Sequence, residues 1–344
     1  MVTASDGVHG FPAALTSFVG RDAPLREVAA LLAGHRLVTV TGPGGSGKTR
    51  LAAEVARQVA GRFADGAWLA ELAPVADEEQ VAGVVATALG VREQPGVPAA
   101  GALARVLARQ QVLLVLDNCE HVIGAAAALC AGLLSACDDV RVLATSREPL
   151  RVAGEARYRL GPLALPDPDD PGGLADASGG EAVALFADRA RDADAHFSLD
   201  DQTGLAVAAL VTRLDGMPLA IELAEAGEHD QAAAALAGYA LDVAEQAAAG
   251  LWTKTGEPDT ARWLDSEDAT MRQVLAWAMD HDSPVALRLA IALEMWWFQR
   301  GRQPGLYPLL REVTGYAEPG SEWWCHAQRQ AGWAASGRLT WPGR

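Results

Sequence analysis

The stretch GPGGSGKT at residues 42–49 contains the residue types that a loop needs to bind a phosphate chain. Its glycines allow the backbone to turn N–H groups inward around the phosphates, and the lysine supplies an ammonium for the terminal phosphates. The threonine hydroxyl is a ligand for Mg²⁺, and a helix beginning near the lysine adds its positive dipole end. The spacing GxxxxGK[ST] therefore predicts a phosphate site made of Gly42, Gly44, Gly45, Ser46, Gly47, Lys48 and Thr49.

Lys48 is unusual in this sequence because arginine supplies almost all of the positive charge. Of the 28 lysine and arginine residues, only Lys48 and Lys254 are lysines. A chance glycine turn is the alternative interpretation of the loop, but a β-branched run precedes it and a helical pattern follows it. This combination favours a phosphate-binding loop (P-loop) in which the ammonium of Lys48 has a chemical role.

A second charged position follows an apolar strand. The nearly uninterrupted apolar run at residues 111–118 contains Asp117 near its end, where a carboxylate could hold Mg²⁺ or its water shell. The alternative is that Asp117 caps the helix that follows, which is a common structural role for aspartate. Because a P-loop precedes it, the sequence favours Thr49 and Asp117 as the two protein groups at the metal.

Arg147 lies near the end of another apolar run, at residues 140–148. The intervening length and helix suggest that this strand lies between the P-loop strand and the Asp117 strand. Arg147 would then emerge close to the terminal phosphate. We expect Arg151, Arg157 and Arg159 to belong to a solvated basic face instead.

These residues require a scaffold of alternating strands and helices. Apolar runs predict strands at residues 36–41, 67–72, 111–118, 140–148 and 157–160, with helical patterns between the first four. Uniformly apolar strands separated by helices indicate a parallel sheet covered on both faces, with ligands at the carboxyl ends of its strands. The predicted fold class is therefore α/β, with the sheet of a P-loop NTPase.

The rest of the chain is expected to be helical. A segment dense in Pro, Asp and Gly at residues 161–180 is typical of a linker or surface loop. Nine of the ten tryptophans lie after residue 250, which indicates that the packing changes near there. The predicted parts are an N-terminal segment at 1–34, a P-loop core at 35–165, a small helical lid at 166–228, and a Trp-rich, TPR-like helical-repeat region at 229–344.

Composition limits the surroundings and partners that are plausible. The 344-residue chain carries a net charge of −16 and has a pI near 4.8, which argues against direct nucleic-acid binding. Its four cysteines lack the spacing of a zinc module, and reduced thiols are the default. The N-terminus does not read as a secretory signal, and the most apolar run, residues 122–137, is short for a membrane span. We expect a cytoplasmic protein without membrane contact.

Five segments together resemble the nucleotide-binding module of the STAND class, and most closely the NB-ARC-like ATPases of AfsR/SARP-type and LuxR-type transcriptional regulators. They are FVGRDAPL (18–25), the P-loop, LVLDNCEH (114–121), VLATSREPL (142–150) and LDGMPLAIELA (214–224). Such modules are similar to AAA+ ATPases and act as switches that rest with ADP and rearrange or oligomerise when ATP replaces it. The resemblance implies binding of ATP and ADP with Mg²⁺, and a protein partner or self-association through the helical tail.

The resemblance also implies individual roles. Val19, Gly20 and Arg21 would lie along the adenosine, Arg147 would sense the γ-phosphate, and Pro218 would pack against adenine. From the residues alone, Gly20 and Arg21 could instead form a turn into the next helix. Pro218 could equally be an ordinary first residue of a helix.

The sequence departs from the family pattern near the metal. Hydrolytic relatives often carry a second acidic residue directly after the Mg²⁺ aspartate, whereas this chain has Asn118, which cannot act as a base. Glu120 is the nearest replacement, but its position is more typical of a helix start. We therefore expect slow ATP hydrolysis.

Two larger departures concern the helical part. Relatives carry a winged-helix domain after the LDGMPLAIELA-like motif, and neither that domain nor a DNA-binding domain is recognised here. Residues 279–282, MDHD, superficially mimic the missing nucleotide-contacting motif but read as a turn between helices. The repeat-like tail is expected to be truncated.

Three functions remain open on the sequence. The first is a nucleotide-dependent switch of a transcriptional-regulator type with weak ATPase activity. The second is a nucleotide-binding interaction protein that does not hydrolyse ATP. The third, a small-molecule P-loop kinase, is disfavoured because no substrate lid with clustered acids or arginines is evident.

Overall fold

The computed structural model describes residues 7–300 except 15, 93–95, 167–179, 226, 228, 252–259, 261–263 and 266, together with residues 315, 319–321, 324, 325 and 328. The chain divides into two compact units, Met1–Ala208 and Ala209–Arg344. Residues 167–179, Lys254 and most of the C-terminal tryptophans lie outside the described residues, so the expectations for them stay predictions.

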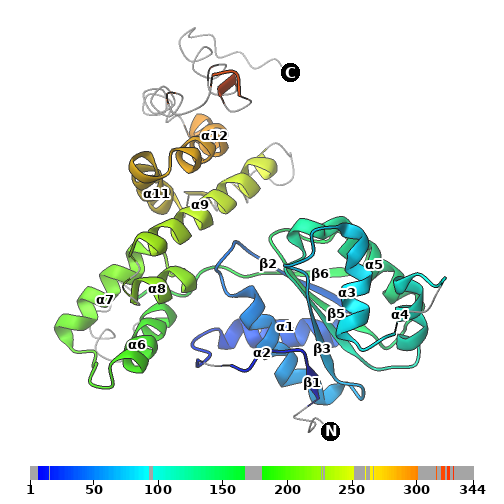
Figure 1. Cartoon of the computed structure of the whole chain (residues 1–344). Helices are drawn as coiled ribbons and strands as arrows, with labels where there is room; N and C mark the ends of the chain where they lie inside the picture. Colours follow the sequence, from blue (N-terminus) through cyan, green and yellow to red (C-terminus); the bar gives the residue numbers. More distant parts are fainter. Residues whose placement is uncertain are drawn as a thin grey trace. The chain divides into compact units, whose positions relative to one another are not determined.

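A six-stranded parallel sheet forms the centre of the first unit (Figure 1). Its order is β1-β3-β4-β5-β2-β6, so β5 lies between β2 and β4 as the sequence predicts. The strands are β1 (Val8–His9), β2 (Leu37–Thr41), β3 (Ala67–Glu71), β4 (Leu113–Asp117), β5 (Arg141–Ser146) and β6 (Glu155–Arg159). The α/β fold class is confirmed, and the short edge strand β1 is an addition that no sequence pattern indicated.

Helices cover both faces of this sheet (Figure 1). One face packs against α1 (Asp22–Gly34) and α2 (Lys48–Val59). The other packs against three helices, α3 (Val81–Ala88), α4 (Ala99–Leu107) and α5 (Ile123–Ala136). Short 3₁₀ turns occur at η1 (Ala60–Arg62), η2 (Glu78–Gln80) and η3 (Cys119–Val122).

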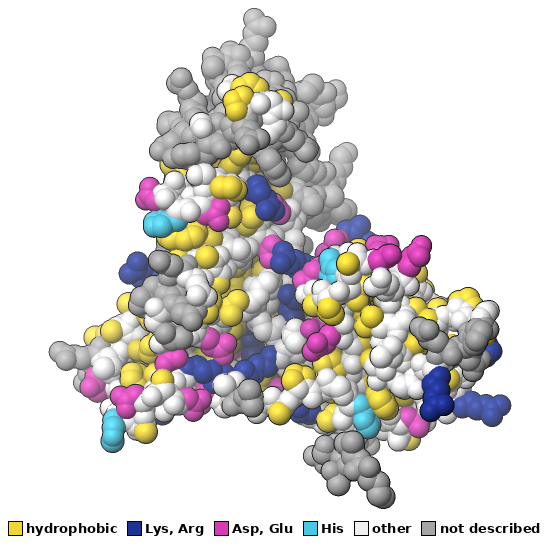
Figure 2. Space-filling view, in the orientation of Figure 1, with side chains coloured by type: hydrophobic (Ala, Val, Ile, Leu, Met, Phe, Trp, Pro, Cys, Tyr) yellow, Lys and Arg dark blue, Asp and Glu magenta, His cyan; other side chains and the backbone are white. Residues whose placement is uncertain are grey.

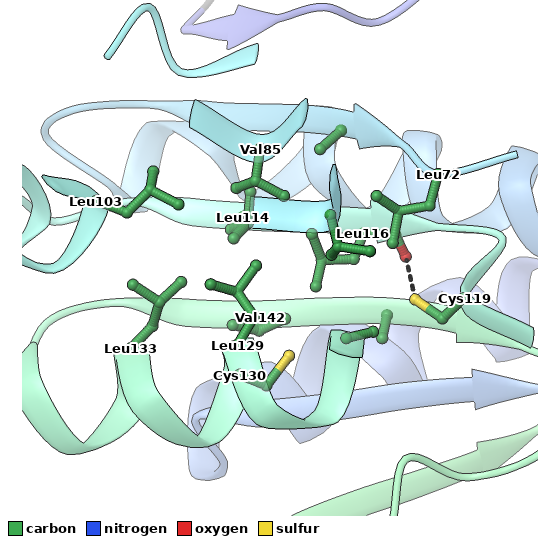
Figure 3. Packing of buried hydrophobic residues seen from close by; sticks show 14 of the residues in the cluster. Leu72, Val85, Leu103, Leu114, Leu116, Cys119, Leu129, Cys130, Leu133 and Val142 are labelled. Atoms are coloured by element: carbon green, nitrogen blue, oxygen red, sulfur yellow. Dashed lines mark hydrogen bonds between the residues drawn. The ribbon is translucent and has the colours of Figure 1, made fainter. Parts of the chain in front are cut away.

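Strand β4 shows why the central strands are apolar without alternation. Leu114 and Leu116 belong to the cluster under α3, α4 and α5, whereas Leu113 and Val115 belong to the cluster under α1 and α2. Side chains on both faces of a parallel strand are buried, so a polar alternation would place polar groups in a core. Figure 3 shows Leu114 and Leu116 beside Val85 and Leu72 in this packing.

The most apolar stretch of the chain follows β4. By length and composition alone, Cys119–Ala136 is the one helical stretch among the described residues that could cross a membrane. In the structure this stretch packs on the sheet through Ala126, Leu129, Cys130 and Leu133, which are all buried. A third of it is buried, because the small residues of its other face are exposed or half-buried.

Among the described residues after β6, every regular element is a helix, as expected. Helix α6 (Glu181–Ala193) belongs to the first unit, and α7 (Asp201–Arg213) crosses the division. The second unit contains α8 (Pro218–Glu225), α9 (His229–Leu251), α11 (Asp268–His281) and α12 (Ser283–Gln299). Because α11 ends at His281 and α12 begins at Ser283, the MDHD segment occupies the last turn of one helix and the junction to the next.

A tryptophan helps to fix the packing of the second unit. Helices α9, α11 and α12 pack together, and Trp296 of α12 is fully buried. Its indole N–H donates a hydrogen bond to Oδ1 of Asp265 at 3.1 Å. This agrees with a packing role for the aromatic residues of this region rather than a ligand cage.

Candidate phosphate and metal site

The P-loop lies between the carboxyl end of β2 and the start of α2, so the predicted strand, loop and helix are all present. Gly45 and Gly47 adopt φ values of 74° and 88°, which favour glycine. A Cβ atom on Gly42 would lie 2.6 Å from the carbonyl oxygen of Leu160, so no larger residue fits there without a shift. The backbone of the loop thus explains where glycine is needed.

Lys48 begins α2 at the end of this loop. Only 8% of the residue is exposed, and its Nζ donates a hydrogen bond to the carbonyl oxygen of Pro43 at 2.9 Å. The Ser46 hydroxyl donates to the same carbonyl oxygen, also at 2.9 Å. The ammonium is therefore held over the loop, where a bound phosphate could take the place of that carbonyl as its partner.

Thr49 and Asp117 meet at the head of the loop. The Thr49 hydroxyl lies 2.8 Å from Oδ1 and 3.0 Å from Oδ2 of Asp117, although 68 residues separate them. Thr49 is in the first turn of α2, and Asp117 is the last residue of β4. The two candidate metal groups are brought together by the fold, with a hydroxyl and a carboxylate as oxygen donors.

Thr145 is a third member of this group that the sequence analysis missed. Its side chain is buried on β5, and its hydroxyl donates to Oδ1 of Asp117 at 2.6 Å. The same hydroxyl accepts a hydrogen bond from the backbone N–H of Asn118 at 2.9 Å. Thr145 therefore fixes both the carboxylate and the chain that follows it. The sequence feature that could have indicated this role is a polar threonine near the carboxyl end of an otherwise apolar strand.

The segment after Asp117 turns sharply. Asn118 has φ 63°, a left-handed conformation that asparagine tolerates better than most residues. Its side-chain amide lies 3.4 Å from Nδ1 of His121, whose Nε2 lies 3.0 Å from the carbonyl oxygen of Val75. Glu120 lies in η3, as expected for a helix start.

Arg147 directly follows β5 and lies beside the P-loop strand. The register pairs Thr41 with Ser146, so Arg147 emerges next to Gly42. Its Nε forms an ion pair with Oε1 of Glu120 at 3.4 Å.

The predicted adenosine segment contacts the P-loop through Arg21. Gly20 and Arg21 have φ values of 67° and 66°, and they form the turn into α1. The buried guanidinium of Arg21 donates to the carbonyl oxygens of Ser46 at 3.2 Å, Gly161 at 2.7 Å and Pro162 at 3.1 Å. Burial lowers the pKa of Arg21, while the nearby Glu181 raises it. Val19 directly precedes this turn.

Glu181, the first residue of α6, is another residue that the sequence did not reveal. Its Oε1 accepts a hydrogen bond from the N–H of Arg21 at 2.9 Å, and its Oε2 accepts from the N–H of Ala164 at 3.2 Å. A Cβ atom on Gly20 would lie 2.9 Å from Cβ of Glu181. The turn at Gly20 is therefore held between the P-loop and α6.

Pro218 lies in the second unit, where it is the first residue of α8. Gly216, two residues earlier, has φ 63° and closes the preceding helix, because its N–H donates to the carbonyl oxygen of Val211 at 3.0 Å. The local geometry is that of ordinary helix punctuation. A contact of Pro218 with adenine remains a prediction.

Three of the four cysteines are buried in the packing of the first unit. Cys119, Cys130 and Cys137 are free and buried, and the Cys119 thiol lies 3.5 Å from the carbonyl oxygen of Leu116 (Figure 3). Burial raises the pKa of Cys130 to about 12, so the thiolate is scarce at neutral pH.

On the face seen in Figure 2, basic and acidic side chains are interspersed among the described residues.

Comparison with known proteins shows what the part of the chain that carries this site is similar to. Residues 21–159 match the NB-ARC domain. An uncharacterized protein of Mycobacterium tuberculosis (strain ATCC 25618 / H37Rv) is 43% identical over 212 residues, which are 62% of this chain and 51% of that protein. The chain thus spans about half the length of that relative.

A candidate HTH-type transcriptional regulator of the same organism is 43% identical over 197 residues, 57% of this chain and 21% of that protein. Among solved structures, a STAND protein with a tetratricopeptide repeat sensor from Pyrococcus horikoshii is 13% identical, with a TM-score of 0.41 over 94% of this chain and 62% of that one. A Walker-type ATPase of Pyrococcus abyssi is 13% identical, with a TM-score of 0.43 over 95% of this chain and 87% of that one.

Proposed function

We propose that this chain is a signal-transduction switch that binds ATP and ADP with Mg²⁺. The match of residues 21–159 to the NB-ARC domain supports this proposal. The contact between Thr49 and Asp117 at the head of the P-loop carries this proposal. A hydroxyl and a carboxylate close together at the head of a P-loop are oxygen donors of the kind that Mg²⁺ uses together with bound phosphates, and this supports the proposal. Lys48 would neutralise the phosphates from the other side.

The donor set fits Mg²⁺ only together with a nucleotide. Among the described residues, no group of three or more His, Cys, Asp or Glu side chains could hold a metal by itself. Mg²⁺ usually binds through one or two carboxylates plus substrate phosphates and water, rather than in an all-protein cage. Thr49 and Asp117 would therefore hold the ion, which would offset phosphate charge once the nucleotide is bound.

We assign the adenosine side to the segment at Val19, Gly20 and Arg21, and to Pro218. The guanidinium of Arg21 is already bonded to three carbonyl groups, one of which belongs to Ser46 of the P-loop. This supports a role in which Arg21 braces the loop while the backbone of the segment faces the nucleoside. The contribution of Pro218 is carried over from the family motif.

Hydrolysis should be slow. Asn118 has no carboxylate, and its amide lies beside His121 rather than presenting a base to an attacking water. The same observation supports the second candidate function, a nucleotide-binding interaction protein without turnover. Phosphate release from ATP that depends on Lys48 would support the switch, whereas nucleotide binding without any release would support the second candidate.

The regulatory setting is also part of the proposal. A related module occurs in a candidate HTH-type transcriptional regulator, and this supports a cytoplasmic role in signal transduction. The helices of the second unit would provide the surface for a protein partner or a second copy. We expect no direct contact of this chain with nucleic acid or a membrane.

Arg147→Ala should weaken ATP binding by roughly 10-fold and ADP binding by less than about twofold, because only ATP offers a γ-phosphate to the guanidinium. Isothermal titration with each nucleotide in the presence of Mg²⁺ measures both values. The matched control is Arg151→Ala, since Arg151 is exposed and pairs with Glu148. Equal losses for both nucleotides would remove the sensor role of Arg147.

Thr145→Val should raise the Mg²⁺ concentration needed for half-maximal nucleotide binding by about 10-fold, because a residue that orients a metal ligand affects metal affinity strongly. The valine has nearly the same shape but offers no proton to Asp117. Thr145→Ser keeps the hydroxyl and should retain most of the Mg²⁺ affinity. The measurement is a Mg²⁺ titration at fixed ADP, and identical curves for valine and threonine would refute this positioning role.

A further inference from the structure

Glu120 forms an ion pair that the proposed metal and phosphate chemistry does not use. Its Oε1 lies 3.4 Å from Nε of Arg147, and their side chains are 18% and 48% exposed respectively. The second carboxylate oxygen of Glu120, Oε2, is buried and has no hydrogen-bond partner within the described part of the chain. Glu120 is thus a partly buried negative charge for which Arg147 is a direct ionic partner.

The topology places this pair at the edge where the phosphates would bind. Arg147 follows β5, which lies between the P-loop strand β2 and the Asp117 strand β4. Glu120 lies in η3, three residues beyond Asp117. The two acidic side chains of this segment differ in their partners, because Asp117 contacts Thr49 and Thr145 whereas Glu120 contacts Arg147.

We propose that Glu120 determines how strongly the site discriminates between ATP and ADP, by holding Arg147 when no γ-phosphate is present. This inference rests on the proposed function, in which Arg147 contacts the γ-phosphate. For Arg147 to make that contact, its ion pair with Glu120 must be weakened or broken. The carboxylate left behind also repels the γ-phosphate, because both groups are negative. Both effects penalise ATP, and neither acts on ADP to the same degree.

The variant Glu120→Gln tests this competition because it removes the charge and keeps the size of the side chain. We expect ATP affinity to increase by about three- to tenfold and ADP affinity to change by less than about twofold, since a partly exposed ion pair contributes modestly. Both dissociation constants are measured on the full chain by calorimetry with Mg²⁺. An equal change for ATP and ADP would overturn the inference.

Glu148→Gln is the matched control. Glu148 is adjacent to Arg147 in sequence, its side chain is 47% exposed, and it pairs with Arg151 instead. The substitution removes a carboxylate charge next to Arg147 in the sequence but leaves the pair between Glu120 and Arg147 intact. We expect it to leave the ratio of ATP to ADP affinity unchanged, and a gain in ATP affinity equal to that of Glu120→Gln would contradict a specific role for Glu120.

A double variant separates this inference from the function on which it rests. In an Arg147→Ala background, Glu120→Gln should keep only the part of its effect on ATP that comes from repulsion of the γ-phosphate, because the competition for the guanidinium no longer exists. A full effect in that background would reject the proposed competition. If the wild-type chain binds ATP and ADP but Glu120→Gln changes the two affinities by the same factor, only the present inference fails. If the wild-type chain binds neither nucleotide, the proposed function fails as well.

Discussion

Lys48→Ala should reduce the affinity for both ATP and ADP by at least roughly 100-fold, which amounts to loss of binding at micromolar concentrations. Lys48 is 8% exposed as a residue, and its ammonium donates a hydrogen bond to the carbonyl oxygen of Pro43, 2.9 Å away. Charged hydrogen bonds to phosphate are among the stronger polar contacts. Alanine leaves the phosphate charge without this partner.

Calorimetry with each nucleotide, together with phosphate release from ATP, measures the effect of Lys48→Ala. Arg57→Ala is a suitable control, since it removes a cation from the same helix. Arg57 lies in the later turns of α2, where its Nη1 is 2.8 Å from Oε1 of Glu54. Circular dichroism should show that both variants fold. If Lys48→Ala binds ATP about as well as the control does, the ammonium has no role at the phosphates.

Asp117→Asn should lower Mg²⁺-dependent phosphate release by roughly 100-fold, while nucleotide binding without Mg²⁺ is largely retained. Asparagine keeps the size of the side chain and one oxygen acceptor for Thr49 and Thr145, but it removes the negative charge at the metal. A neutral amide is a poorer ligand for Mg²⁺ or its water shell than a carboxylate. The loss should therefore appear in the Mg²⁺ dependence and not in the fold.

The assay for Asp117→Asn is phosphate release measured over a range of Mg²⁺ concentrations. Asp139→Asn provides the control, because Asp139 is exposed in the turn just before β5, at the opposite end of the strand from Arg147. If the wild-type chain releases no phosphate, the same comparison can be made with Mg²⁺-dependent ADP binding. An Asp117→Asn protein with a wild-type Mg²⁺ dependence would show that the carboxylate does not act at the metal.

The central sheet and the P-loop could be predicted because their signals are local and redundant. The glycines, Lys48 and Thr49 occur at fixed spacing, and the flanking strand and helix have the apolar patterns that their burial requires. The position of β5 between β2 and β4 followed from the length of the connections, and the strand order confirms it. The family resemblance is likewise confirmed over residues 21–159.

Contacts across strands could not be predicted, because they depend on register. Thr145 bonds Asp117 only because β5 pairs with β4 in a register that places the two residues at the same edge of the sheet. The ion pair of Glu120 with Arg147 and the bond of Glu181 to Arg21 join segments 27 and 160 residues apart. Single-residue patterns carry no information about such pairs.

Element ends were also less predictable than the elements themselves. The run at 111–118 forms a strand only over Leu113–Asp117, because Asn118 turns into a left-handed conformation. Strand β1, which pairs with β3, has only two residues and is too short to leave a periodic signal in the sequence.

Calorimetric titration of the purified wild-type chain with ATP and with ADP, each in the presence of Mg²⁺, tests the central claim most directly. The account predicts saturable heat with both nucleotides, and its loss in Lys48→Ala. Folded wild-type protein that gives no binding heat with either nucleotide at several temperatures would contradict the assignment of residues 42–49 as a nucleotide site.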